Sequence, residues 1–164
     1  MFRLFLVLVL TLSTNPIFAC SIPYPETALG KSELIAHAGS IALVKPIHAE
    51  RMGRYTNWSF KIVERLKGDL EEGTVVTVNL LAAGEAIREM DFERHEMPGF
   101  WDVFLGRLPW LPGECTPRYE FESGGTYMLF LDAMANSASA ERINDKSDKW
   151  YRFVVDEVSK SNAQ

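Results

Sequence analysis

The stretch YTNWSFKIVERLKGDLEEGTVVTVNLL, residues Tyr55–Leu81, decides the fold of this chain. Over Tyr55–Leu66, apolar and polar residues alternate, which is the period of a β-strand with one buried and one exposed face. Thr74–Leu81 is rich in β-branched residues and predicts a further strand. The polar, glycine-containing residues between the two segments are typical of a turn. Two strands joined by a turn are therefore the starting point for the fold.

Three more segments are predicted to be strands from their apolar and β-branched content: Ser40–Ala49, Gly125–Met134 and Trp150–Val158. Pro46 lies within the first of them and indicates an edge or a bulge, because proline cannot donate a backbone hydrogen bond. A short helix is predicted over Lys31–Ala38, where Gly39 is a natural stop. Asn136–Asp148 is small and polar and is expected to be a solvated hairpin loop.

A long insertion, Ala82–Glu120, separates the third and fourth predicted strands. Ala86–Glu96 is expected to be helical, and Met97–Gly113 is dense in aromatic residues, proline and glycine. The apolar side chains of this segment either cover one end of the fold or form an exposed anchor for a protein partner. The candidate partner contacts are Phe100, Trp101, Phe104 and Trp110.

Five strands, one early helix and the insertion at 82–120 predict a mainly β fold. We expect the five predicted strands to form an OB-type barrel. A β-sandwich is the second choice, because it needs more strands than this sequence offers. We expect residues 20–164 to form a single domain.

Met1–Ala19 is predicted to be a removable secretory signal. It has one arginine near its start, the apolar run Leu4–Leu12 and a small residue at the expected cleavage site. That run is too short to span a bilayer, which takes roughly 20 helical residues. We therefore expect an exported protein, secreted or periplasmic, that has no transmembrane helix.

Cys20 follows the expected cleavage site, and Cys115 is the other cysteine of the chain. In an oxidising compartment two cysteines most often pair, and this bridge would close a loop of about 95 residues. Two unrelated thiols are the alternative. Ordinary cleavage leaves Cys20 as a free N-terminal residue, whereas a lipoprotein pathway acylates it and anchors the chain to a membrane.

The composition and the scarcity of catalytic motifs exclude several function classes. The chain has a formal net charge of −5 and no cluster of Lys and Arg, which is unfavourable for binding nucleic acid. Its histidines show no metal-ligand spacing: His37, His48 and His95. Ser123 is not part of a nucleophile elbow, and the acidic residues between Glu85 and Glu96 are typical of a solvated helix face. We predict no catalytic residue, metal or cofactor, with an unrecognised hydrolase as the enzymatic alternative.

Several stretches follow one another in an informative order: Cys20-Ser21 after the cleavage site, the strand end Glu64–Gly68 (ERLKG), the strand Thr74–Asn79, and Phe121–Leu131 (FESGGTYMLFL). The last has the order Phe, small spacer, Gly, Tyr, apolar, Phe, apolar. This arrangement resembles the inhibitory module of the tissue inhibitors of metalloproteinases and the netrin-type modules. The resemblance extends from Cys20 to Asp132.

The resemblance implies an OB-type barrel, no enzymatic activity and a protein partner. In its most specific form, Cys20 and Ser21 dock in the cleft of a zinc metalloprotease. The α-amino nitrogen and carbonyl oxygen of Cys20 would then chelate the open position of the catalytic zinc. Ile22 stands where the animal inhibitors have a second cysteine, so one N-terminal bridge of that family is absent. The alternative is a lipid-anchored envelope protein with a structural or interaction role.

Overall fold

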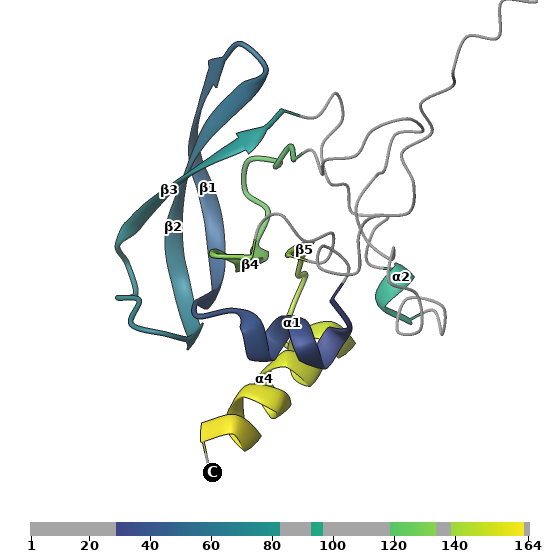
Figure 1. Cartoon of the computed structure of the whole chain (residues 1–164). Coiled ribbons are helices and arrows are strands. Elements are labelled where there is room, and N and C mark those ends of the chain that lie inside the picture. The colour runs from purple at the N-terminus through teal and green to yellow at the C-terminus, as the bar shows by residue number, and fades with distance from the viewer. Residues whose placement is uncertain (1–28, 83–92, 97–118, 134–138, 163–164) are drawn as a thin grey trace, which may run out of the picture.

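The computed structural model describes residues 29–82, 93–96, 119–133 and 139–162 (Figure 1). In chain order the elements are α1 (Lys31–His37), β1 (Ile41–Met52), β2 (Tyr55–Lys67), β3 (Val75–Leu81), α2 (Glu93–Glu96), β4 (Tyr127–Phe130), β5 (Ala140–Arg142) and α4 (Lys149–Asn162). The strands form one five-stranded antiparallel sheet in the order β3-β2-β1-β4-β5. The predictions of a mainly β fold and of a short helix before the first strand are confirmed. β3 and β5 are the two edges, and no described residue pairs these strands with each other.

β1 and β2 form the long central hairpin of the sheet (Figure 1). The register between them shifts at several points, and the shift between Pro46 and His48 leaves Ile47 without a partner on β2. The prediction of a bulge or an edge at Pro46 is therefore confirmed. β1 pairs with β4 only over Ile41–Val44, so in the described part of the chain the rest of β1 is paired on one side alone. Register shifts of this kind increase strand twist, which coils the sheet around one face.

The coiled face of the sheet encloses an aromatic core. Phe121, which precedes β4, lies at its centre, with ring centroids 5.0 Å from Trp58 and 5.0 Å from Phe60. Tyr127 packs edge-on against Phe121 at 4.9 Å, and Tyr119 stacks on it at 6.0 Å. All five side chains are buried. Aromatic pairs in these geometries contribute about 0.5–1.5 kcal/mol beyond the burial of their area.

A second core lies on the opposite face, where α1 and α4 cover the first half of β1 together with β4 (Figure 1). Leu34 and Ile35 of α1 and Trp150 and Val154 of α4 are buried there. Both faces of this part of the sheet are therefore covered. This explains why Ile41–Val44 is a continuous buried run with no polar alternation.

The predictions for the C-terminal third of the chain are wrong in two places. Trp150–Val158, expected to be a strand, belongs to the helix α4. Its buried residues Trp150, Tyr151, Val154 and Val158 have helical spacing, which the aromatic and β-branched composition had obscured. The fifth strand is instead β5, inside the segment Asn136–Asp148 that was expected to be a solvated loop.

Several predicted features lie outside the described residues. They are the signal Met1–Ala19, the predicted inhibitory residues Cys20 and Ser21, the predicted disulfide partner Cys115, and the partner contacts Phe100, Trp101, Phe104 and Trp110. Of the helix expected over Ala86–Glu96, the described part is α2. Within the described ranges, no helix combines the length and apolar character needed to cross a membrane.

Candidate functional site

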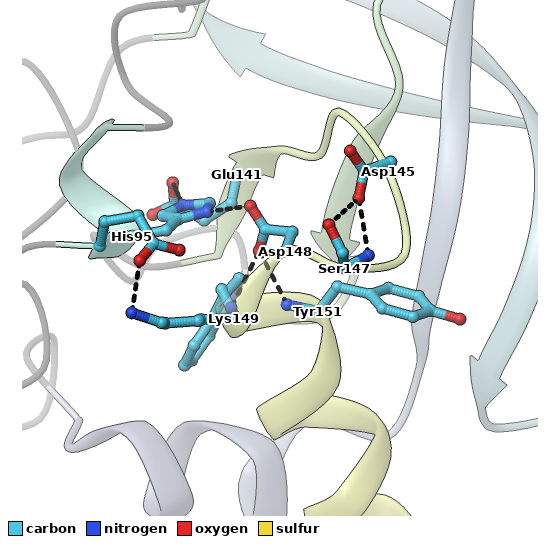
Figure 2. A network of polar contacts seen from close by, with 9 residues as sticks. His95, Glu141, Asp145, Ser147, Asp148, Lys149 and Tyr151 are labelled. Carbon is cyan, nitrogen blue, oxygen red and sulfur yellow. Dashed lines mark hydrogen bonds and ion pairs between the residues drawn. The ribbon is translucent and has the colours of Figure 1, made fainter.

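A buried polar cluster connects α2, β5 and the beginning of α4 (Figure 2). It consists of His95 from α2, Glu141 from β5 and Asp148, the residue before α4. His95 Nδ1 lies 2.6 Å from Asp148 Oδ2, and His95 Nε2 lies 3.2 Å from Glu141 Oε2. The side chains of His95 and Glu141 are 1% and 2% exposed, and that of Asp148 is 7% exposed. An imidazole is therefore held between two carboxylates away from solvent.

The two carboxylates determine the charge of His95. Burial alone lowers the pKa of an imidazole, because it penalises the charged form. Hydrogen bonds and charges from Asp148 and Glu141 outweigh burial here and raise the pKa of His95 to about 9. At neutral pH His95 is thus an imidazolium that donates both N–H groups to carboxylate oxygens.

Asp148 has a second role at the start of α4. Its Oδ1 accepts hydrogen bonds from Trp150 N at 2.8 Å and Tyr151 N at 3.0 Å, which makes Asp148 the N-cap of this helix. The preceding turn is ordered in the same way, since Asp145 Oδ1 accepts a bond from Ser147 N at 2.7 Å (Figure 2). One aspartate therefore fixes both the beginning of α4 and the position of His95.

Two further contacts surround the cluster. On its inner side, Tyr119 and Ser139 share a buried hydrogen bond of 2.8 Å between their hydroxyl oxygens. Burial raises the pKa of Tyr119 above its usual range, and the charge of Glu141 raises it further, against the lowering effect of the bond to Ser139. On the exposed side, Lys149 and Glu96 form an ion pair. The cluster is thus enclosed between the aromatic core and the surface.

The arrangement is suited to holding elements together rather than to catalysis. A general base needs a ring nitrogen within reach of a substrate proton, and both nitrogens of His95 are bonded to carboxylates. Within the described residues, no group of three or more His, Cys, Asp and Glu side chains could hold a metal ion. What the cluster provides is a charged attachment of α2, a part of the insertion, to β5 and α4.

A second candidate site is an open groove beside the bulge of β1, which we call the edge groove. It has a volume of about 240 Å³ and, for comparison, small-molecule pockets measure roughly 300–1,000 Å³. Its lining residues are Pro46, Ile47, His48, Ala49, Trp58, Phe121 and Ser123. Ile47 is 55% exposed, although its side chain is fully apolar. The indole N–H of Trp58 is buried and has no hydrogen-bond partner among the residues that the structure describes. The walls of the groove are thus mainly apolar.

The histidines and Ser123 lie in different parts of the structure. His95 is in the polar cluster, His48 and Ser123 line the edge groove, and His37 is exposed in the last turn of α1. Sequence reasoning missed the polar cluster, because its carboxylates lie in the segment expected to be a loop. The N-cap aspartate in front of residues with helical spacing was a signal for the beginning of α4, and so for one member of the cluster.

Comparisons with known proteins add no relative: no protein-family model, no curated protein and no solved structure matches this chain.

Proposed function

We propose that this protein is an exported, non-catalytic binding module built on a partly open OB-type barrel. The strand order is compatible with a partly open barrel, because β1 pairs with both β2 and β4 and leaves β3 and β5 as the two edges. Ala82, directly after β3, forms a parallel bridge with Tyr119, whose hydroxyl shares a hydrogen bond with Ser139, directly before β5. The aromatic side chains around Phe121 fill the interior that such a barrel requires.

The observation that carries the binding role is the edge groove. Exposed apolar side chains beside aromatic ones are the usual centre of a protein interface. Ile47 extends from the bulge of β1 to the rim of this groove, where β1 has no strand on its second side among the described residues. The partner is therefore a protein rather than a nucleic acid.

The most specific form of this function is inhibition of a zinc metalloprotease through Cys20 and Ser21, with Cys20 bridged to Cys115. It is supported by the resemblance of Phe121–Leu131 to a strand of the metalloproteinase inhibitors. In the structure that stretch buries Phe121 and continues into β4, as a core strand of the barrel requires. The amine of Cys20 must be unacylated for this role, since an amide nitrogen cannot chelate zinc.

Inhibition assays on a panel of zinc proteases test this function. The native mature chain is expected to inhibit at least one of them, and a variant with one alanine added before Cys20 is expected not to, because the chelating pair is displaced. A matched variant, Ile47→Ser, replaces the exposed apolar side chain at the rim of the edge groove with a small polar one. We expect it to weaken partner binding while the N-terminal chelate stays intact. Equal inhibition by the native and extended chains would show that the chelate is wrong.

A further inference from the structure

The outer edge of β3 is defined by its hydrogen bonds to β2. Ile62 N donates to Thr74 O at 2.9 Å, and Ala82 N donates to Arg54 O at 3.0 Å. The even-numbered positions of this strand therefore bond toward β2. In an antiparallel ladder the alternate residues direct their N–H and C=O groups to the other side. The odd-numbered residues of β3 thus present their backbone groups at the edge of the sheet.

Within the described part of the chain, this edge is unpaired over most of its length. Tyr119 N donates to Leu81 O at 2.9 Å, which pairs the last residue of β3. Among the described residues, no backbone group bonds the outward sides of Val75, Thr77 and Asn79. Backbone donors and acceptors left in this way form a ready template for another strand.

The edge also lacks the features that normally prevent such pairing. Thr74–Leu81 contains no charge and no proline, whereas the open side of β1 has both a proline and a bulge. Val75 is 54% exposed, and Val76 and Val78 are half-buried against the aromatic core. A strand of this kind has high β-propensity and no charge or proline that would prevent pairing. It is stable in solution when a second strand covers its edge.

We propose that β3 pairs antiparallel with β3 of a second copy of this chain, which extends the sheet across a homodimer. The outward-bonding residues set the register. With the two-fold axis at Thr77, each Thr77 faces its equivalent, and Val75 of one copy faces Asn79 of the other. This register satisfies the outward N–H and C=O groups of all three residues on both copies. It also places threonine opposite threonine, a favourable cross-strand pair.

The charges at the two ends of β3 select a second copy as the partner. Glu71 and Glu72 are exposed just before the strand, and the other end lies beside the exposed Arg54 of the β1–β2 turn, with the exposed Arg51 near the end of β1. Antiparallel self-pairing brings the glutamates of one copy toward the arginines of the other at both ends. The opposite, parallel orientation would bring like charges together. The proposed dimer depends neither on Cys20 nor on the proposed inhibitory role. Each of the two proposals can therefore fail without the other.

Sedimentation equilibrium on the exported protein tests the dimer. The native chain is expected to show a monomer–dimer equilibrium that weakens as salt is raised. Thr77→Pro removes an N–H at the outer edge while sparing the bonds to β2, so we expect a monomer. The matched control, Thr77→Val, keeps that N–H and is expected to dimerise. Glu71→Lys and Arg54→Glu should each weaken the dimer, and their combination should restore it.

Hydrogen exchange on the native chain gives an answer that does not depend on any variant folding. The amides of Val75, Thr77 and Asn79 are expected to exchange slowly at high protein concentration and much faster on dilution, while those bonded to β2 change little. A native chain that is monomeric at every concentration, with these three amides unprotected, would overturn the proposal. The edge would then be left to a strand from a different protein. A dimer that survives Thr77→Pro would overturn it as well.

Discussion

Asp148 serves two elements with its two carboxylate oxygens: Oδ2 lies 2.6 Å from His95 Nδ1, and Oδ1 caps α4. The position of the insertion helix α2 and the beginning of the C-terminal helix are therefore fixed by one side chain. Glu141 completes the arrangement from β5, on the far side of the imidazole. Segments that are distant in the chain are joined in this way through a buried charge, and the stability of their junction depends on that charge.

Replacing His95 tests how much the buried cluster stabilises the fold. His95→Leu leaves two buried carboxylates without their cation, and losing one partner of a buried ionic group costs about 3–5 kcal/mol. We expect a loss of that size in the free energy of unfolding from urea titration. His37→Leu is the control, because His37 is exposed, and it should change stability by less than about 0.5 kcal/mol. Similar losses for both variants would contradict the role of the cluster.

The raised pKa of His95 predicts how stability changes with pH. Because the folded-state pKa, about 9, lies above the ordinary value of 6.5, the contribution of His95 is fully present below pH 6.5. This contribution is lost as pH rises through 9. By linkage, the difference between the folded and ordinary pKa of His95 corresponds to about 3 kcal/mol in the free energy of unfolding. The difference in unfolding free energy between the native chain and His95→Gln should shrink over this window. An NMR titration in which the His95 ring loses its proton below pH 7 would rule this out.

The two functions of Asp148 can be separated by a pair of substitutions. Asp148→Asn keeps an oxygen that can cap α4 but removes the charge beside His95, so the pKa of His95 should fall while the helix stays capped. Asp148→Ala removes both and should cost about 1 kcal/mol more than Asp148→Asn. Thermal unfolding and the NMR titration of His95 measure the two effects. If the two variants are equally stable, the capping role of this residue is wrong.

A turn glycine provides a separate test of the packing between β2 and the start of β1. Gly68 and Gly73 both have φ of +85°, where a side chain is strained. A Cβ on Gly68 would lie 2.5 Å from Gly39 O, whereas a Cβ on Gly73 would meet nothing within 4 Å. Gly73→Ala should therefore cost about 1 kcal/mol and Gly68→Ala about 2–4 kcal/mol. The difference in their unfolding midpoints measures the close approach of Gly68 to Gly39.

Sequence patterns predicted β2 because its side chains alternate between a buried and a more exposed face. Trp58, Phe60 and Ile62 alternate with polar neighbours, and all three are in the core. The same reasoning failed for α4, where Tyr151 and Val154 have strong β-propensity but pack on α1 and β4 from a helix. Secondary-structure propensity is a weak signal where tertiary packing favours a different structure. For α4, the N-cap at Asp148 was the stronger local signal.

The polar cluster could not have been predicted from spacing. His95 precedes Glu141 by 46 residues and Asp148 by 53, so only the tertiary fold brings the imidazole to the two carboxylates. For the edge groove, the sequence predicted only the edge or bulge at Pro46. Its other walls depend on Phe121 crossing the face of the sheet, which no local pattern encodes.

The mass of the intact mature protein, measured without reduction, tests the central claim most directly. An exported binding module that acts through its N-terminus is predicted to begin at Cys20, with an unmodified amine and a mass two hydrogens below that of the reduced chain. That mass corresponds to a bridge between Cys20 and Cys115. A mass increased by acyl chains at Cys20 would contradict the account, because the amine would then be an amide and the chain a membrane-anchored lipoprotein.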